Sequence, residues 1–220
     1  MLGYVCKYTP MELFEAMDTE ITRLEPSVTD FNHADTLMHA NICSYTKAVL
    51  EDVMEHDYEG VILTTCCDSI RRLYDTLKSQ FPDKFFFLLD IPRKFNDFAV
   101  ALYERQLKQM LTEYKAFSGK TLDLKRFVSM MQNKAALKKQ ENTRMSASAA
   151  SEKGNGQKLN IGIMGARCNN EIRQLLVDRS ANLLFDLTCT GLARDFSITE
   201  DQTLHSYAAA LLNQIPCMRM

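Results

Sequence analysis

The sequence lacks an excess of positive charge and any long apolar run. Its 26 basic and 28 acidic residues give a net charge of -2, so no electrostatic attraction to nucleic acid is expected. No apolar run is long enough to span a bilayer, and residues 1–7 lack the basic and apolar regions of a signal peptide. We therefore expect neither a nucleic-acid nor a membrane partner. We also expect a cytoplasmic location, in which the seven cysteines stay reduced.

The sequence also lacks the familiar short motifs of catalytic and metal sites. No CxxC pair of a ferredoxin or zinc ribbon is present, and the four histidines do not show the HExxH spacing. No Ser-His-Asp or Cys-His arrangement can be identified either. The composition, with 46% hydrophobic and 25% charged residues, is that of a globular protein, and 220 residues suffice for one large or two small domains.

Strands and helices alternate along the sequence. The runs GYVCKY, ITRLEP, GVILTT and KFFFLLD predict strands, the last two buried because they are continuously apolar. Helices are predicted from Pro10, from Cys43 to Glu55 and from Cys67 to Phe81. The alternation resumes at LNIGIMG and NLLFDL. We therefore predict an α/β fold of two doubly wound, Rossmann-like parallel-sheet lobes with a helical connection, the second lobe being incomplete.

Four segments are predicted from these elements. They are an N-terminal α/β lobe at 1–94, a helical segment at 95–141, a flexible linker at 142–158 and a partial C-terminal α/β lobe at 159–220. Thr199 is expected to cap a last helix in the second lobe. Because two strands cannot cover such a lobe, its sheet edge and several apolar side chains should be exposed. These are residues 183–187, Leu211, Leu212 and Ile215.

Two cysteines, Cys43 and Cys67, each open a predicted helix, and Cys67 also follows a buried strand. A helix N-terminus stabilises the thiolate, which is the form that binds metal. Sites in parallel sheets form at the carboxyl ends of strands, where Cys67 and Asp90 both fall. The pair indicates part of a soft-metal or iron–sulfur site, the alternative being two inert buried cysteines. The adjacent Cys66 is expected to point to the opposite face and to be structural.

Two further features each have a functional and a purely structural interpretation. Arg71 lies four residues after Cys67 on the same helix face, where it would balance cluster charge, hold a phosphate or pair with Asp75. The turn IGIMGARC resembles a phosphate-binding turn, but Cys168 occupies its last position, which favours a tight turn between strand and helix. Arg167 in that turn is placed to meet an anionic ligand.

The same segments resemble the 2-hydroxyacyl-CoA dehydratase D-component family, which includes the benzoyl-CoA reductase subunits. GYVCKYTPMELFEAM is similar to the family's opening strand and Thr-Pro-x-Glu-Leu helix, and NICSYTKAVLED to its first cluster-cysteine segment. TTCCDSIRRLYD resembles the family's Thr-Cys-Asp followed by an Arg-Arg-Leu-Tyr helix, and DIPRK resembles its Asp-x-Pro-Arg turn. Because MGARC, FDLTCTG and LLNQIPCM also resemble successive family segments, the resemblance covers nearly the whole chain in order.

The resemblance implies an iron–sulfur enzyme. Family subunits hold a 4Fe-4S cluster through three cysteines, and the match assigns two of them to Cys43 and Cys67, the latter directly before the aspartate. Two homologous subunits pair, and a separate ATP-dependent iron–sulfur activator supplies one electron. The implied reaction is the radical elimination of water from a 2-hydroxyacyl-CoA, which is favoured over the reduction of an aromatic ring.

The resemblance also implies a missing ligand. In the family the third cluster cysteine lies beyond the segment that resembles IPCM, whereas this sequence stops at Met220. We therefore expect a truncated subunit, which is a fragment, a split gene product or a degenerate relative, or else a chain in which another residue replaces the third ligand. Cys189, at the end of a strand, is the best substitute, and Cys217 is the next candidate. Two alternatives remain open: a non-catalytic partner subunit without a cluster, and a reductase-type electron-transfer subunit like those of benzoyl-CoA reductase.

Overall fold

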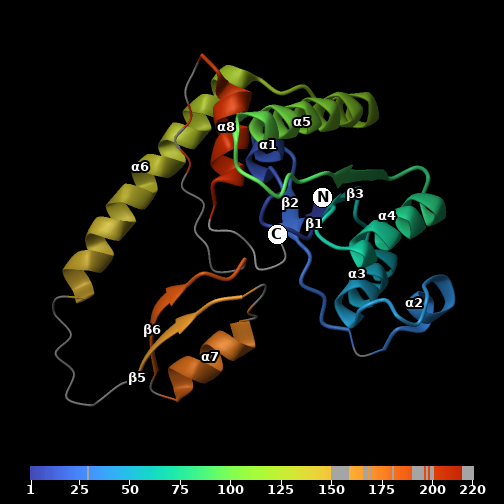
Figure 1. Ribbon diagram of the computed structural model, residues 1–220, viewed down its shortest axis with the longest axis horizontal. Coiled ribbons are helices and arrows are strands. Elements are labelled where there is room, and N and C mark those ends of the chain that lie inside the picture. Colours follow the sequence, from blue (N-terminus) through green and yellow to red (C-terminus); the bar gives the residue numbers. More distant parts are fainter. Residues whose placement is uncertain are drawn as a thin grey trace.

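A computed structural model describes residues 1–28, 30–149, 159–165, 168, 170–179, 181–189, 196, 198 and 201–214. Their centre is a four-stranded sheet in the order β2-β1-β3-β4, in which all neighbouring strands are parallel (Figure 1). The strands are β1 (Leu2–Tyr4), β2 (Ile21–Arg23), β3 (Gly60–Thr64) and β4 (Phe85–Leu89). The strands β2, β3 and β4 lie within the runs that predicted them, and β1 begins one residue before its run, which confirms the α/β fold with a parallel sheet.

Helices cover both faces of this first sheet. All five residues of β3 are buried, as expected of a continuously apolar strand in a parallel sheet. Alternate side chains of β4 enter different cores, Phe85 and Phe87 on one face and Phe86 on the other. The first face is covered by α1 (Met11–Glu15), α5 (Asp97–Ser118), α6 (Leu124–Ala149) and α8 (Thr203–Leu212). The second face is covered by α2 (Asn32–Leu37), α3 (Ser44–Glu55) and α4 (Asp68–Gln80).

Two helices differ from the prediction: α2 was not predicted, and α6 is longer than predicted. The helix α2 lies in a polar stretch for which no element was expected, and the buried Glu51 of α3 fixes it. The Glu51 carboxylate accepts a hydrogen bond of 2.7 Å from the main-chain nitrogen of Ala34 and lies 2.7 Å from Nδ1 of His33. The helix α6 continues to Ala149, into the expected linker. Residues 150–158 lie outside the described part of the chain.

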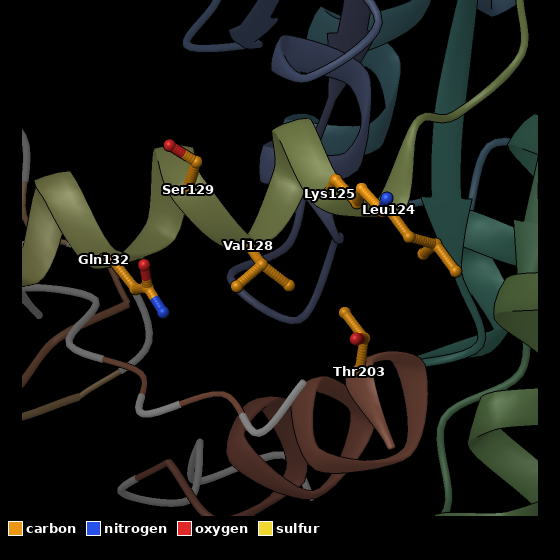
Figure 2. A pocket seen from close by; sticks show the side chains of 6 residues that line it. All are labelled: Leu124, Lys125, Val128, Ser129, Gln132 and Thr203. Atoms are coloured by element: carbon orange, nitrogen blue, oxygen red, sulfur yellow. The ribbon is translucent and has the colours of Figure 1, made fainter. Parts of the chain in front are cut away.

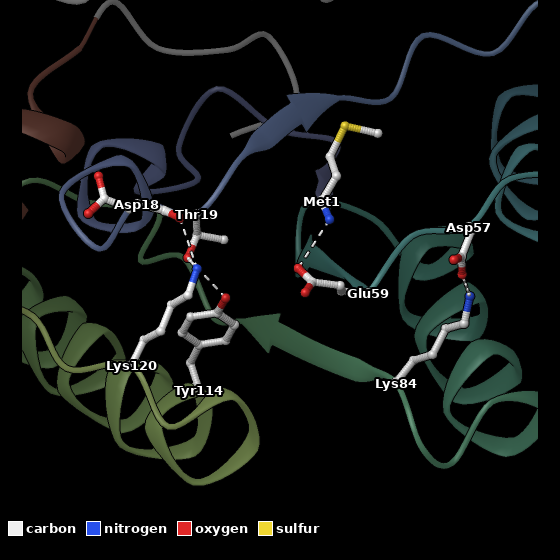
Figure 3. A network of polar contacts seen from close by, with 8 residues as sticks. All are labelled: Met1, Asp18, Thr19, Asp57, Glu59, Lys84, Tyr114 and Lys120. Atoms are coloured by element: carbon white, nitrogen blue, oxygen red, sulfur yellow. Dashed lines mark hydrogen bonds and ion pairs between the residues drawn. The ribbon is translucent and has the colours of Figure 1, made fainter.

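The amino edge of the first sheet is closed by polar contacts (Figure 3). Gly119 ends α5 in the left-handed region, at φ +74°, and the chain turns there towards α6. The following Lys120 donates to the hydroxyl of Thr19 at 3.0 Å, and that hydroxyl lies 3.1 Å from the Tyr114 hydroxyl. The turn between α5 and α6 is thereby joined to the turn between α1 and β2.

The helix α8 belongs to the core of the first sheet and not to a second lobe. Tyr207 and Leu211 are fully buried in that core, and the Tyr207 hydroxyl donates to Oε2 of Glu12 at 2.5 Å. The expectation that Leu211 and Leu212 are exposed is therefore wrong. The physical reason is that α5 presents a long apolar stripe, whereas two strands offer little surface to an apolar helix. The N-cap residue of α8 is Gln202, so the expectation that Thr199 caps this helix is wrong. Thr199 and Ile215 themselves lie outside the described residues.

A second, two-stranded parallel sheet follows α6. It consists of β5 (Leu159–Ile163) and β6 (Ala181–Asp186), and α7 (Asn170–Asp178) packs against β6. Leu184 and Phe185 are 59% and 47% exposed, as predicted for an uncovered sheet, whereas Leu183 and Leu187 are half-buried. A Cβ atom on Gly162 would lie 2.1 Å from the Phe185 ring, so only glycine leaves room for that ring. Across the described residues, no helix combines the length and apolar character needed to cross a membrane.

Candidate metal centre

Four cysteines gather at the carboxyl edge of the first sheet. Cys6 lies two residues beyond β1, Cys66 and Cys67 form part of the turn after β3, and Cys43 immediately precedes α3. Because parallel strands end at the same edge, segments far apart in sequence meet there. We call these four residues the thiol edge. None of the six cysteines in the described part of the chain forms a disulfide.

The Cys43 thiol is the one best prepared to ionise. Its Sγ lies 3.2 Å from Oγ1 of Thr46, one turn into α3. Burial opposes ionisation, but hydrogen bonds from Thr46 and from the Ser69 hydroxyl outweigh it, so the pKa of Cys43 falls below its usual value. Cys43 is also the exposed member of the thiol edge. A lowered pKa and exposure are the properties of a reactive or metal-binding cysteine.

Cys67 lies next to Cys43 at the start of α4. It is the N-cap residue of that helix, as Cys43 is of α3. A charge on Cys67 would raise the pKa of Cys43, and Ser69 of α4 bonds to Cys43, so the two helix starts are in contact. The structure therefore brings together the two cysteines that the sequence singled out.

Cys66 does not point away from Cys67, contrary to the expectation. Alternation between faces applies to an extended strand, whereas residues 65–67 form a turn. Both cysteines pack against the core beneath α2, α3 and α4. A hydrogen bond to Cys67, and then burial, raise the pKa of the Cys66 thiol strongly, so this thiol stays neutral.

Cys6 is a member of the thiol edge that sequence reasoning missed. A charge on Cys6 contributes to the raised pKa of Cys66, which places the two thiols near one another. The strand register agrees, because Tyr4 of β1 pairs with Ile62 of β3, four residues before Cys66. The sequence signal that could have identified Cys6 is its position just beyond β1, because β1 ends at the same edge of the sheet as β3.

Cys189 lies apart from Cys43 and Cys67, in the turn after β6. Its main-chain oxygen accepts a hydrogen bond of 2.7 Å from Nη1 of Arg23, the last residue of β2. The Nε of Arg23 is buried and has no hydrogen-bond partner among the described residues. Cys217, the next candidate, lies outside the described part of the chain.

These residues fit an iron–sulfur cluster in part. Two adjoining thiols, one with a lowered pKa, are the donors that iron–sulfur clusters and soft metals require, and the orphaned N–H of Arg23 suits an anionic group. Within the described ranges, however, no group of three or more Cys, His, Asp or Glu side chains is placed to hold a metal ion. The described residues thus provide a two-thiol site.

The remaining candidate residues have ordinary partners. Arg71 lies 4.0 Å from Asp68 on its own helix, and Arg72, not Arg71, pairs with Asp75 at 3.0 Å. Asp90, after β4, accepts a hydrogen bond of 2.7 Å from the Thr65 hydroxyl, which joins two strand ends at the thiol edge. The turn after β5 contains Gly165 at φ +144°, while Ala166 and Arg167 lie outside the described residues.

A separate cavity of about 430 Å³ lies between the first half of α6 and the start of α8 (Figure 2). Figure 2 shows Val128 and Gln132 on the side of α6 that faces Thr203 of α8. None of its described lining residues is a cysteine, a histidine or an acid. They are Leu124, Lys125, Val128, Ser129, Gln132 and Thr203. The cavity therefore adds no donor to the thiol edge.

Comparison with protein families finds a family model that matches the part of the chain containing the thiol edge. Residues 6–148 of the 220 match the family model described as 2-hydroxyglutaryl-CoA dehydratase, D-component. The matched segment contains the whole thiol edge and ends before β5. No curated protein matches the sequence. Because the family match covers more than half of the chain, the protein belongs to the 2-hydroxyglutaryl-CoA dehydratase D-component family.

Proposed function

We infer that the chain is an iron–sulfur subunit of a 2-hydroxyacyl-CoA dehydratase, a lyase. Cys43 and Cys67 are two thiolate ligands of its 4Fe-4S cluster, and Cys189 is the third. The observation that carries this inference is the approach of Cys43 to Cys67, through Ser69, at the carboxyl edge of a parallel sheet. Family membership supports the reaction class.

The residues of this chain have distinct tasks in that function. When bound, the cluster would supply a low-potential electron to the substrate. The hydroxyls of Thr46 and Ser69 favour the thiolate form of Cys43 by lowering its pKa, and the neutral Cys66 donates to Cys67. The overall reaction removes water from a 2-hydroxyacyl-CoA to give an enoyl-CoA, and the electron is returned. A homologous second subunit and an ATP-dependent iron–sulfur activator are the partners, in the cytoplasm.

The wider organisation of the chain belongs to the same proposal. We assign the two parallel sheets to two Rossmann-like lobes, with the first sheet holding two ligands and the second holding Cys189. A benzoyl-CoA-reductase-like subunit would use the same cluster ligands, so product analysis with a 2-hydroxyacyl-CoA and with an aromatic acyl-CoA separates the two reactions.

One observation favours a second function. The described residues contain no group of three metal donors, and the same lack is expected of a subunit that has lost its cluster. Such a chain would pair with a cluster-bearing homologue and would serve as a non-catalytic partner.

Anaerobic reconstitution with iron and sulfide decides between the two functions. The iron–sulfur subunit should become brown and hold about four iron ions per chain, as a 4Fe-4S cluster requires. Cys43→Ser and Cys67→Ser should each lower the iron content, whereas Cys66→Ala should not. A colourless wild-type chain would favour the partner subunit. Equal iron loss in Cys66→Ala and Cys67→Ala would contradict the ligand assignment.

A further inference from the structure

The cavity between α6 and α8 has a buried floor and a polar rim. Val128 and Thr203 are each 7% exposed, whereas Lys125, Ser129 and Gln132 are exposed. Its volume of about 430 Å³ lies in the range of sites for small molecules, which combine apolar walls with a few polar groups. The cavity is therefore large enough for a ligand and offers it both kinds of contact.

The three polar side chains at the rim are not used by contacts inside the protein that the structure describes. The side chains of Lys125, Ser129 and Gln132 form no hydrogen bond or ion pair with any described residue. Two other cations of α6 differ, because Arg126 and Lys134 each pair with a carboxylate in the segment 15–18. The rim therefore keeps its donors for a molecule from solution.

The charges around the cavity favour an anion. Lys125 is the charged side chain among its described lining residues. The nearby Asp123 carboxylate accepts hydrogen bonds from the main-chain nitrogens of Lys125 and Arg126, at 2.9 and 3.3 Å, and thereby caps α6. Thr203 is the first residue of α8, and the side chain of its N-cap residue Gln202 does not cap that helix, so the positive end of the helix dipole adds to the charge of Lys125. One lysine balances one negative charge, which fits a carboxylate better than a doubly charged phosphate.

The lining side chains follow a fixed order along the cavity. Leu124 and Lys125 lie in the first turn of α6, Val128 lies one turn further and Gln132 one turn beyond that. At about 1.5 Å per residue, Lys125 and Gln132 are separated by about 10 Å along the helix axis. Figure 2 shows Val128 and Gln132 on the side that faces Thr203, with Leu124 and Lys125 at the opposite end from Gln132. A ligand that spans the cavity meets a cation, then apolar surface and then an amide.

We propose that this cavity binds a short unbranched acid with a hydrogen-bonding group at its far end. The carboxylate meets the ammonium group of Lys125, the chain lies against Leu124 and Val128, and the terminal group bonds to the side-chain amide of Gln132. Burial of the chain and pairing of one charge supply the binding free energy. None of the described lining residues belongs to the thiol edge, so this site is separate from the function inferred above.

Isothermal titration calorimetry of the full chain under reducing conditions, with 6-hydroxyhexanoate as the probe, tests the site. We expect saturable binding at about one site per chain. Lys125→Met should weaken the binding about tenfold, as loss of a charged hydrogen bond does. Lys134→Met is the matched control, because it removes the same charge from the same helix but from a lysine that pairs with Glu15, and it should leave the affinity unchanged. Both side chains are on the surface, so both variants should fold, which their urea midpoints check.

Two further probes separate the contacts. Hexan-1-ol has the chain without the charge and should bind about tenfold more weakly than hexanoate. Gln132→Leu should weaken 6-hydroxyhexanoate about fivefold but leave hexanoate unchanged, because only the first probe has a terminal hydroxyl. Absence of saturable binding, equal affinity for hexan-1-ol and hexanoate, or equal effects of Lys125→Met and Lys134→Met would overturn the proposal. These results do not depend on whether the chain binds iron, so the site and the function inferred above can fail separately.

Discussion

Replacing Leu211 by alanine tests whether α8 belongs to the core of the first sheet. The Leu211 side chain is fully buried in the cluster that contains Tyr103 and Leu107 of α5. Truncation of a buried leucine removes apolar contacts and leaves a cavity, which costs about 2–5 kcal/mol of unfolding free energy. Leu184→Ala is the matched control. Its side chain is 59% exposed on β6, so the same truncation should cost less than about 1 kcal/mol.

Urea unfolding under reducing conditions, followed by far-ultraviolet circular dichroism, gives both free energies from the midpoints and slopes. Tyr207→Phe adds a third measurement. It removes the hydroxyl that donates to the buried Glu12 carboxylate, which should cost about 1–3 kcal/mol. If Leu211→Ala unfolds within about 1 kcal/mol of the wild type, the packing of α8 on α5 is refuted.

Two predictions concern ionisation. Hydrogen bonds from Thr46 lower the pKa of Cys43 against the effect of burial, so Thr46→Val should raise that pKa and slow alkylation of Cys43 near neutral pH. Mass spectrometry of each cysteine over a pH series measures this, and an unchanged midpoint would count against it. Burial and then the bond to Asp52 raise the pKa of Tyr58 to about 12, above the value of about 10 in an unfolded chain. The stabilisation is therefore complete below a pH of about 10 and lost as pH rises towards 12. Tyr58→Phe should flatten this alkaline loss of unfolding free energy, and a slope like that of the wild type would show that Tyr58 is not its source.

The central part of the first sheet was predictable from the sequence because β3 and β4 are short apolar runs bounded by turn residues. The run GVILT is buried on both faces in a parallel sheet, and the sequence shows this directly as the absence of alternation. The same logic located the starts of α3 and α4, and with them Cys43 and Cys67. Local sequence signals therefore sufficed for features that depend on the residues of one element alone, such as the burial of a strand or the start of a helix.

The contacts between distant elements were not predictable. The sequence shows that α8 has an apolar face. It does not show that α5, and not the second sheet, covers this face, because the packing depends on surfaces that other parts of the chain form. The same limit applies to Cys6 and to the Arg23 contact with Cys189, which arise from strand order. Cys66 was misplaced because the strand rule was applied to a turn.

Alkylation of every cysteine, with and without a reconstituted cluster, tests the central claim most directly. A sulfur bound to iron is protected from the reagent, so the ratio of the two rates identifies the ligands in one experiment. The account predicts protection of Cys43, Cys67 and Cys189, and no change at Cys6 and Cys168. Equal alkylation of Cys43 and Cys67 in the loaded and unloaded protein would contradict it.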